Sequence, residues 1–381
     1  MLQNIMPAFK IADFLLFLVQ CQLLFDVILA QREYNDNAYA GIPHVIVPRV
    51  GVFIGERTDF AFQVDGFKGI RYAEPPVGSL RWQPPVAISY PYQDFDYLPE
   101  IEATEFGASC MQPQALLEND EDEVGTFAED CLFLNVYKPR HAAMGDNLPV
   151  IVFIHGGMFD SGAGRAYYGE GLVSPRGNPT GSNNVIVVTL NYRLNVFGFL
   201  GDKALGATTS NGSSGNFGIQ DQRQAIQWVS DNIRYFGGDE EKITLMGHSA
   251  GGTSVLNHLV AKTKDGEKPL GSMYRSAIIL SGGYTKGAMD EVDAVPIYSE
   301  VLAKTGCKRL DAKEEVACLK EIDSLVLADV SRSMTEDYRV MWLPIVDGVV
   351  LDGKPHDLIA AGEYNSEVPI VLGSTRDEYA L

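Results

Sequence analysis

The stretch ITLMGHSAGGTSVLNHLV, residues 243–260, joins a short apolar run to a segment that can continue as a helix. Ser249 stands at the junction, between Gly247 and Gly251. A G-x-S-x-G sequence between a buried strand and a helix is typical of a nucleophile elbow, a tight turn that lifts the serine hydroxyl out of the sheet. The glycines permit that turn, and the free N–H groups that begin the next helix favour negative charge beside the hydroxyl. Because the same five residues also occur in ordinary turns, the rest of the chain has to decide between a nucleophile and a turn.

Other short apolar runs in the chain have the character of strands buried on both faces. The stretch 220–236 places Ile226, Val229 and Ile233 on one face of a helix that leads into residues 243–246. Alternation of strand and helix predicts one α/β domain, with a central, mostly parallel sheet flanked by helices. The apolar runs lie at 150–154, 185–190, 243–246, 277–280 and 369–373.

The segment upstream of these runs, residues 50–76, alternates apolar with polar residues and is punctuated by Gly55 and Gly66. This pattern favours antiparallel edge strands, and we expect them to begin the sheet. No repeat, low-complexity tract or linker divides the body of the chain. We therefore expect a single domain over residues 31–381.

The balance of charge and the spacing of possible metal ligands narrow the function classes. Thirty basic against 50 acidic residues give a formal charge of −20, which repels phosphate backbones and disfavours nucleic acid as a partner. No C-x-x-C or H-E-x-x-H spacing is present. We therefore expect no metal site and no other cofactor.

The first thirty residues differ from the remainder. Lys10 is the only basic residue before the apolar run FLLFLVQCQLLF, and VILA, ending at Ala30, can precede a cleavage site. These features predict a signal peptide over residues 1–30 and a secreted, extracellular protein; a cleavage site at 38–40 and a buried N-terminal helix are the alternatives. The run is too short and too interrupted for a membrane anchor. The sequon at Asn211 fits a glycosylated surface loop of such a protein.

Five cysteines are present, and Cys21 lies inside the predicted signal peptide. The remaining four suit an oxidising compartment and allow three pairings. The simplest pairing joins neighbours in the sequence, Cys110 with Cys131 and Cys307 with Cys318. Four buried free thiols are the alternative.

A glycine-rich loop follows the predicted strand at 150–154, in the stretch VIVFIHGGMFDSG. A serine nucleophile creates an oxyanion, which needs backbone donors beside it, and loops of this kind accompany nucleophile elbows. H-G-G alone is more often a turn, but together with the elbow it favours a site. The residues expected to form the oxyanion hole are Gly156, Gly157, Met158 and Ala250.

Ordered matches extend beyond these two motifs, in GIRYAEPPVGSLRW (69–82), EDCLFLNVYKP (129–139), NYRLNVFGFL (191–200) and VPIVLGSTRDE (368–378). On these stretches the chain, from about Val45 to its end, resembles the type-B carboxylesterase family of α/β-hydrolases. That family includes cholinesterases, insect esterases and some lipases. The resemblance implies the α/β-hydrolase fold, incomplete at the C-terminus.

The resemblance also implies roles for individual residues. Ser249 corresponds to the nucleophile, Glu378 to the acid that orients a histidine, and Ser281 to a serine that hydrogen-bonds near that acid. The cysteine pairing given above agrees with the family pattern. Two structural ion pairs are implied, Arg81 with Glu129 and Arg193 with Asp221.

The position of the catalytic histidine is not filled. In α/β-hydrolases the histidine follows both the nucleophile and the acid, and only three residues follow Glu378. We therefore expect a C-terminally truncated chain that holds the N-terminal two thirds of the family domain and is a weak or inactive catalyst. His248 cannot reach back across its own turn to act as the base, and we expect it in the pocket wall.

Two function classes fit the sequence. The intact elbow favours a serine hydrolase of small-molecule carboxylic esters that acts through an acyl-enzyme on Ser249. The alternative is a non-catalytic adhesion or ligand-binding ectodomain, as some members of the resembled family are. A cholinesterase is disfavoured, because those enzymes place Glu where His248 stands. The oligomeric state is left open.

Overall fold

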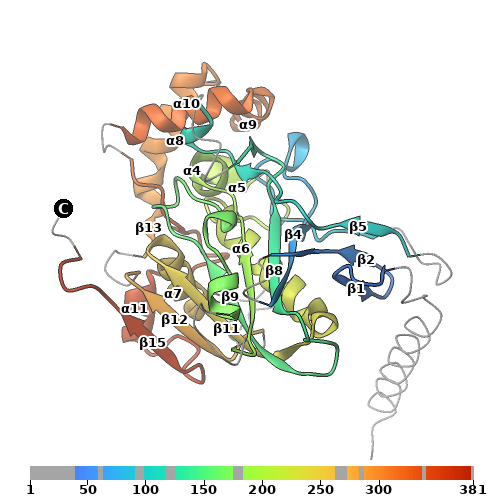
Figure 1. Ribbon diagram of the computed structural model, residues 1–381. Helices are drawn as coiled ribbons and strands as arrows, with labels where there is room; N and C mark the ends of the chain where they lie inside the picture. The colour runs from blue at the N-terminus through green and yellow to red at the C-terminus, as the bar shows by residue number, and fades with distance from the viewer. Residues whose placement is uncertain are drawn as a thin grey trace, which may run out of the picture.

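A computed structural model of the chain describes residues 39–58, 63–90, 98–116, 125–174, 183–261, 273–282, 287–336 and 340–378. The predicted signal peptide and Cys21 lie outside the described residues. The described part is built around one eight-stranded sheet flanked by helices (Figure 1). In spatial order its strands are β15 (Ile370–Gly373), β12 (Ser276–Leu280), β11 (Gly238–His248), β9 (Leu148–Ile154), β10 (Ile186–Leu190), β8 (Phe133–Pro139), β4 (Val64–Arg71) and β3 (Glu56–Arg57).

The sheet is parallel in one half and antiparallel in the other. Every neighbouring pair from β15 to β10 is parallel, whereas the pairs β10–β8, β8–β4 and β4–β3 are antiparallel. All five apolar runs form strands, which confirms the predicted mostly parallel sheet. Strand β10 is buried along its whole length, as expected for a strand covered on both faces.

The expectation for residues 50–76 was correct in part and wrong in part. Strands β3 and β4 join the main sheet at its antiparallel edge, as expected. Strand β2 (Gly51–Ile54) instead pairs with β1 (His44–Val47) and β5 (Glu100–Glu102) in a separate three-stranded sheet. Alternation shows which side chains share a face, but it carries no information about which sheet a strand joins.

Helix α6 (Phe217–Asn232) precedes the central strand β11, and helix α7 (Ala250–Val260) follows it. Helix α6 and the 3-10 turn η5 (Ile233–Phe236) confirm the helix expected over 220–236, and they bury Ile226, Val229 and Ile233. Helix α7 begins directly after Ser249 and is buried along its whole length. Ser249 therefore stands between a strand in the interior of the sheet and a helix that is buried along its whole length.

Three further helices that the sequence patterns did not predict lie together at one end of the molecule, coloured orange in Figure 1. They are α8 (Glu291–Thr305), α9 (Ala312–Glu321) and α10 (Ser324–Thr335). The shorter helices are η2 (Gly78–Leu80), η3 (Pro113–Leu116), η4 (Gly164–Ala166), α3 (Glu170–Val173), α4 (Asn195–Phe199), α5 (Lys203–Gly206) and α11 (Pro355–Ala360). Two small parallel sheets pair β6 (Ser109–Cys110) with β7 (Phe127–Ala128) and β13 (Met289–Asp290) with β14 (Ile345–Val346).

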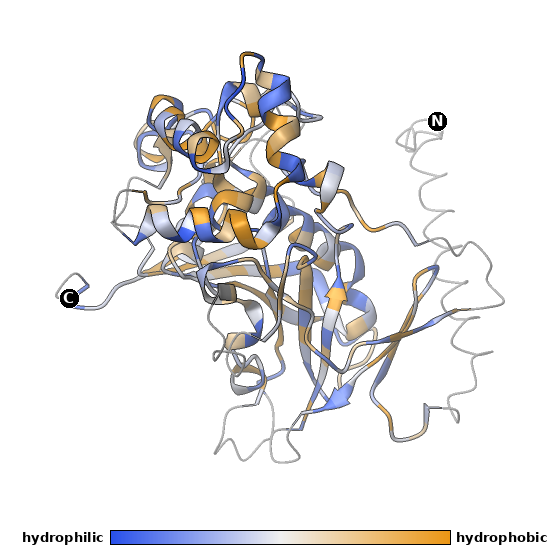
Figure 2. Cartoon of the chain, turned by 90° about the horizontal axis from the view of Figure 1, so that it is seen from above, coloured by the Kyte–Doolittle hydropathy of each residue, from blue (hydrophilic) through white to orange (hydrophobic). Residues whose placement is uncertain are grey.

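Hydrophobic residues run along the strands and alternate with hydrophilic ones along the helices, as Figure 2 shows. One continuous core joins the sheet to α6, α7 and the three helices α8–α10. Within the described part of the chain, no helix combines the length and the apolar character needed to cross a bilayer.

Both expected disulfides are present. Cys110 is bonded to Cys131, next to the start of β8, and Cys307, just after α8, is bonded to Cys318 in α9. Cys110, Cys131 and Cys307 are buried, so these bonds form part of the core. The alternative of four free thiols is therefore wrong.

Candidate active site

Ser249 occupies a strained turn between β11 and α7. Its backbone has φ of 55° and ψ of −121°, a left-handed conformation that residues with side chains rarely adopt. The Ser249 N–H donates to the Leu280 carbonyl of β12 at 2.8 Å, and the Ser249 carbonyl accepts from the Thr253 N–H at 2.9 Å. These bonds to β12 and α7 hold the turn in place.

The glycines around Ser249 are required by close contacts of the main chain. A Cβ on Gly247 would lie 2.2 Å from the Gly251 carbonyl oxygen, and a Cβ on Gly251 would lie 2.0 Å from that of Ile154. No side chain fits at such distances. The start of α7 is thereby packed directly against the end of β9.

The glycine-rich loop after β9 lies beside Ser249. A Cβ on Gly156 would be 3.0 Å from the Cβ of Ser249 and 2.7 Å from the His248 carbonyl oxygen. Gly157, Met158 and the next residue have φ of 113°, 56° and 58°, so the chain curls back on itself at this point. Among the residues that the structure describes, no acceptor is recorded for the N–H groups of Gly157, Met158 and Ala250.

His155 lies beneath this loop and does not face the serine. Its ring is fully buried and stacks on Tyr192, with 4.4 Å between ring centroids, and its Nδ1 lies 2.8 Å from the Gly156 carbonyl. Burial lowers the pKa of His155 to about 4, so the ring is neutral at physiological pH. In that state its Nδ1–H can donate to the Gly156 carbonyl.

Glu378 lies with Ser281 and near His248. Its Oε2 accepts from the Thr375 N–H at 2.9 Å and from the Thr375 hydroxyl. The pKa of Glu378 is lowered, first by the Ser281 hydroxyl, then by Thr375, with a smaller contribution from His248. Ser281, with φ of 53°, is fixed by an N–H bond of 2.8 Å to the Gly373 carbonyl of β15. Carboxylate and serine therefore meet at the carboxyl ends of β12 and β15.

All six histidines of the chain lie in the described residues, and none has a recorded hydrogen bond to Ser249 or Glu378. His248 is exposed and contributes to the lowered pKa of Glu378. His258 is fully buried in α7, where its Nε2 lies 2.9 Å from Gln222 Oε1. The arrangement supplies a hydroxyl, backbone donors and a carboxylate, but no histidine placed between the hydroxyl and the carboxylate.

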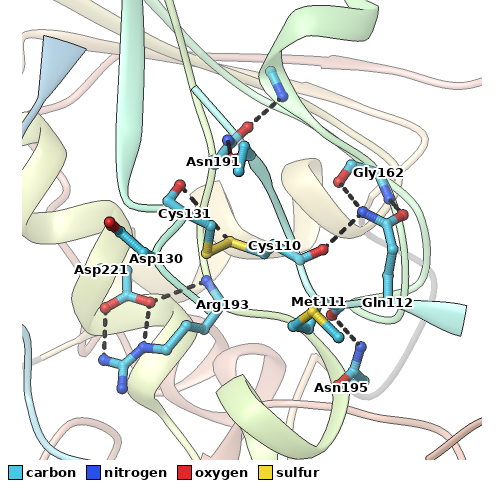
Figure 3. Close-up of a disulfide and its surroundings, with 12 residues drawn as sticks. Cys110, Met111, Gln112, Asp130, Cys131, Gly162, Asn191, Arg193, Asn195 and Asp221 are labelled. Atoms are coloured by element: carbon cyan, nitrogen blue, oxygen red, sulfur yellow. Dashed lines mark hydrogen bonds and ion pairs between the residues drawn. A yellow bond between two sulfur atoms is a disulfide. The ribbon is translucent and has the colours of Figure 1, made fainter. Parts of the chain in front are cut away.

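The residues implied as structural ion pairs do contact one another. Arg193 donates from its side chain to Asp221 at 2.7 and 2.8 Å, and both side chains are buried (Figure 3). Arg81 pairs with Glu129 through two bonds and also donates to backbone carbonyls at the end of α9. The first pair connects the segment after β10 to α6, and the second connects Arg81, just after η2, to the segment before β8.

The predicted glycosylation site and the possible metal ligands remain to be described. Asn211 is exposed, and its Oδ1 accepts from the Ser213 N–H at 3.0 Å. Within the described ranges, no three His, Cys, Asp or Glu side chains gather as a metal site would require.

Four polar side chains that hold the glycine-rich loop were missed from the sequence. Each bonds from a position remote in sequence to the backbone of the loop or, for Asn191, to Gly164 just after it. No local motif marks such contacts, because their partners come from other elements. They are Gln112, Asn191, Tyr192 and Asn195.

Comparison with protein families matches residues 43–381 to the carboxylesterase family. Three curated relatives show the range of matches. A secreted triacylglycerol lipase of Gibberella zeae is 34% identical over 84% of this chain and 55% of its own length. Cocaine esterase of Oryctolagus cuniculus is 33% identical over 83% of this chain and 55% of its own. The crystal protein of Dictyostelium discoideum is 32% identical over 94% of this chain and 60% of its own.

Solved structures give the same picture. A carboxylesterase of Geobacillus stearothermophilus superimposes with a TM-score of 0.72 at 34% identity, over 88% of this chain and 62% of that one. A PNB esterase superimposes with a TM-score of 0.70 at 31% identity, over 87% of this chain and 63% of that one. The chain thus spans 55–60% of the length of the curated relatives named above.

Proposed function

The chain belongs to the carboxylesterase family, and from this premise we propose that the protein hydrolyses carboxylic esters through an acyl-enzyme on Ser249. The observation that carries the proposal is the contact between the elbow and the loop, where even a Cβ added to Gly156 would lie only 3.0 Å from the Cβ of Ser249. A hydroxyl with backbone donors beside it can bind the carbon and the oxygen of one carbonyl group.

In the proposed reaction the Ser249 oxygen attacks the ester carbonyl carbon. The carbonyl oxygen becomes an oxyanion, and the N–H groups of Gly157, Met158 and Ala250 stabilise it. Collapse expels the alcohol, and water then releases the acid from the acyl-serine. Glu378, held as a carboxylate by Ser281 and Thr375, is proposed to orient the base that exchanges protons with Ser249, a role for which none of the six histidines described above is placed.

The substrate class is proposed from the chemistry of the site and from the names of the relatives. Those names include a triacylglycerol lipase and a cocaine esterase, so the shared feature is a carboxylic ester. Met158 is 65% exposed beside the candidate oxyanion donors, and His248 is exposed on the other side of Ser249. We propose both as walls of the ester pocket, with Met158 on the acyl side.

Secretion is proposed on three grounds. Two disulfides suit an oxidising compartment, one relative is a secreted lipase, and the sequence predicts a signal peptide over residues 1–30. The exposed side chain of Asn211 is proposed as a glycosylation site. Release of an N-glycan by an amidase, lost in Asn211→Gln, would test this.

The function is tested by labelling with a fluorophosphonate, which phosphonylates an activated serine. The protein used is the full-length protein, that is, the product of the complete natural gene. We expect one label per chain, located at Ser249 by peptide mapping. Ser249→Ala should abolish labelling and reduce ester hydrolysis by roughly 10⁴-fold or more. A folded full-length protein that never labels would instead support the ligand-binding ectodomain.

A further inference from the structure

The Gln112 side chain clasps the far end of the glycine-rich loop. Its Oε1 accepts from the Gly162 N–H at 2.8 Å, and its Nε2 donates to the Gly162 carbonyl at 3.1 Å and to the Cys110 carbonyl at 3.0 Å (Figure 3). Only 1% of the Gln112 surface is exposed. Both amide hydrogens are thus used, and the side chain is committed to this contact.

Asn195 makes a second connection between the same two segments. Its Nδ2 donates to the Met111 carbonyl at 2.9 Å and to the Asp160 carbonyl at 3.2 Å. The chain next to the disulfide half Cys110 is therefore joined to the loop at two places. A segment 50 residues earlier in the sequence sets the position of Gly162.

The position of Gly162 in turn decides how the peptide between Gly156 and Gly157 is oriented. A Cβ on Gly162 would lie 2.6 Å from the Gly156 carbonyl oxygen and 2.6 Å from His155 Nδ1, so the two backbones are in direct contact. The Gly156 carbonyl and the Gly157 N–H belong to one planar peptide and point in opposite directions. Because the carbonyl faces Gly162 and His155, the N–H is directed away from them.

We propose that Gln112 is a positioning residue of the oxyanion hole. Its amide fixes Gly162, and the contact of Gly162 with the 156–157 peptide keeps the Gly157 N–H directed at the oxyanion formed on Ser249. This inference rests on the proposed function, because the direction of that N–H affects a rate only if Ser249 reacts. Gln112 acts through the loop and touches no reacting atom.

The test measures the two constants of fluorophosphonate labelling in the full-length protein: the half-saturating concentration and the maximal labelling rate. In Gln112→Ala we expect the maximal rate to fall about ten- to a hundredfold, because a donor misplaced by a fraction of an ångström stabilises the developing charge poorly. The half-saturating concentration should stay within about twofold, since the ground-state contacts remain. A general loss of structure would change both constants and the fraction of protein that labels.

Gln83→Ala is the matched control. The Gln83 amide clasps another loop in the same way, donating to the Thr208 carbonyl at 3.0 Å and accepting from the Ser210 N–H at 3.1 Å. We expect it to leave both labelling constants unchanged. Gln112→Glu keeps the side-chain length but places a buried carboxylate oxygen against the Cys110 and Gly162 carbonyls, so its maximal rate should fall at least as far as that of Gln112→Ala. Equal maximal rates in Gln83→Ala and both Gln112 variants would overturn the proposal.

Hydrogen exchange of a peptide covering 155–163 separates this proposal from the proposed function. Gln112→Ala should speed exchange in that peptide about tenfold or more, whereas Gln83→Ala should not, whether or not the wild type labels. If the wild type does not label but this difference is found, the proposed function fails and the clasp stands. If exchange in both variants matches the wild type, the clasp is refuted.

Discussion

At the scale of single residues, the site holds features that oppose stability. Ser249 adopts a backbone conformation that costs a residue with a side chain roughly 1–3 kcal/mol. Asp160, in the glycine-rich loop, has a buried Oδ1 for which no hydrogen-bond partner is recorded among the described residues. Both features lower the free energy of unfolding, and both lie next to the candidate oxyanion hole.

The strain at Ser249 can be measured with two substitutions. Ser249→Gly removes the Cβ and should raise the free energy of unfolding by about 1 kcal/mol, because glycine tolerates positive φ. Ser249→Ala keeps the Cβ and should leave the strain in place. Urea denaturation compares the two variants, and equal stabilities would show that the turn carries no strain.

Asp160 predicts a dependence of stability on pH. Burial raises the pKa of Asp160 to about 6 from 3.8, so the folded state binds this proton more tightly than the unfolded state does. Its contribution to stability is therefore greatest below the unfolded pKa and is lost as pH rises from about 4 to 6. Asp160→Asn should raise the free energy of unfolding by about 1–2 kcal/mol at pH 8, and by less at pH 5. A gain that is the same at both values would contradict the shifted carboxyl.

The site residues predicted from the sequence were those that lie in a motif formed by their own neighbours along the chain. Ser249 and Gly156–Met158 each follow a strand in a recognisable motif, so their place in the fold could be read from the chain. Gln112 and Asn195 could not be identified in this way, because their partners lie 50 and 35 residues along the sequence. A buried amide gives no sign in the sequence of which carbonyl it will meet.

At the scale of elements, α7 is packed against β9 main chain to main chain. The contact between Gly251 and the Ile154 carbonyl leaves no space for a methyl group. Helix and strand are therefore held at a fixed distance, and the start of α7 stays beside the loop that follows β9. The positions of Ser249 and Gly156 depend on this contact.

Gly251→Ala should separate α7 from β9 and lower the free energy of unfolding by about 3 kcal/mol or more. The matched control is Gly171→Ala, also in a helix, where no atom lies within 4 Å of an added Cβ. That variant should be neutral or slightly stabilising. Thermal unfolding of both proteins checks the pair, and similar melting temperatures would contradict the close contact.

The two disulfides close loops of different length, with sequence separations of 21 and 11 residues. Loop-closure entropy predicts that each bond contributes about 3 kcal/mol, with the longer loop ahead by roughly 0.5 kcal/mol. Replacing Cys110 and Cys131 with alanine should therefore cost slightly more than replacing Cys307 and Cys318. Urea denaturation of the two double variants makes the comparison. A larger loss from the Cys307–Cys318 pair would contradict it.

At the scale of the whole molecule, the two edges of the main sheet differ. The antiparallel edge ends in the short strand β3. At the other edge, β15 presents Ile370, Val371 and Leu372, which are 38%, 59% and 70% exposed. An exposed apolar edge strand pairs readily with another chain, and the net charge of −20 opposes such contact only at long range.

We therefore expect the 381-residue chain to associate at raised concentration and salt. Val371→Lys should weaken association at least severalfold, since a charge at the edge disfavours pairing. Val292→Lys, on α8, is the control: the residue is 73% exposed but lies on a helix. Sedimentation velocity measures the effect, and equal association of the two variants would show that β15 is not the contact.

The whole architecture was only partly predictable. Runs such as 150–154 and 185–190 identify central strands because burial on both faces requires continuous apolar sequence. The separate sheet formed by β1, β2 and β5 could not be predicted, since pairing between distant strands is not encoded in either one alone. Nothing was predicted for helices α8–α10; in α8, Pro296 lies inside the helix, where a proline in the sequence argues against one.

The contacts at Gly156, Ser249 and Gly251 have an evolutionary consequence. The backbone around Ser249 is held by main-chain contacts at these glycines and by buried side chains such as Gln112 and Asn195, not by the exposed residues at the rim. Side chains at the rim, such as Met158 and His248, can then change without disturbing it. Related proteins could therefore differ in which ester they accept and still share the same backbone around Ser249.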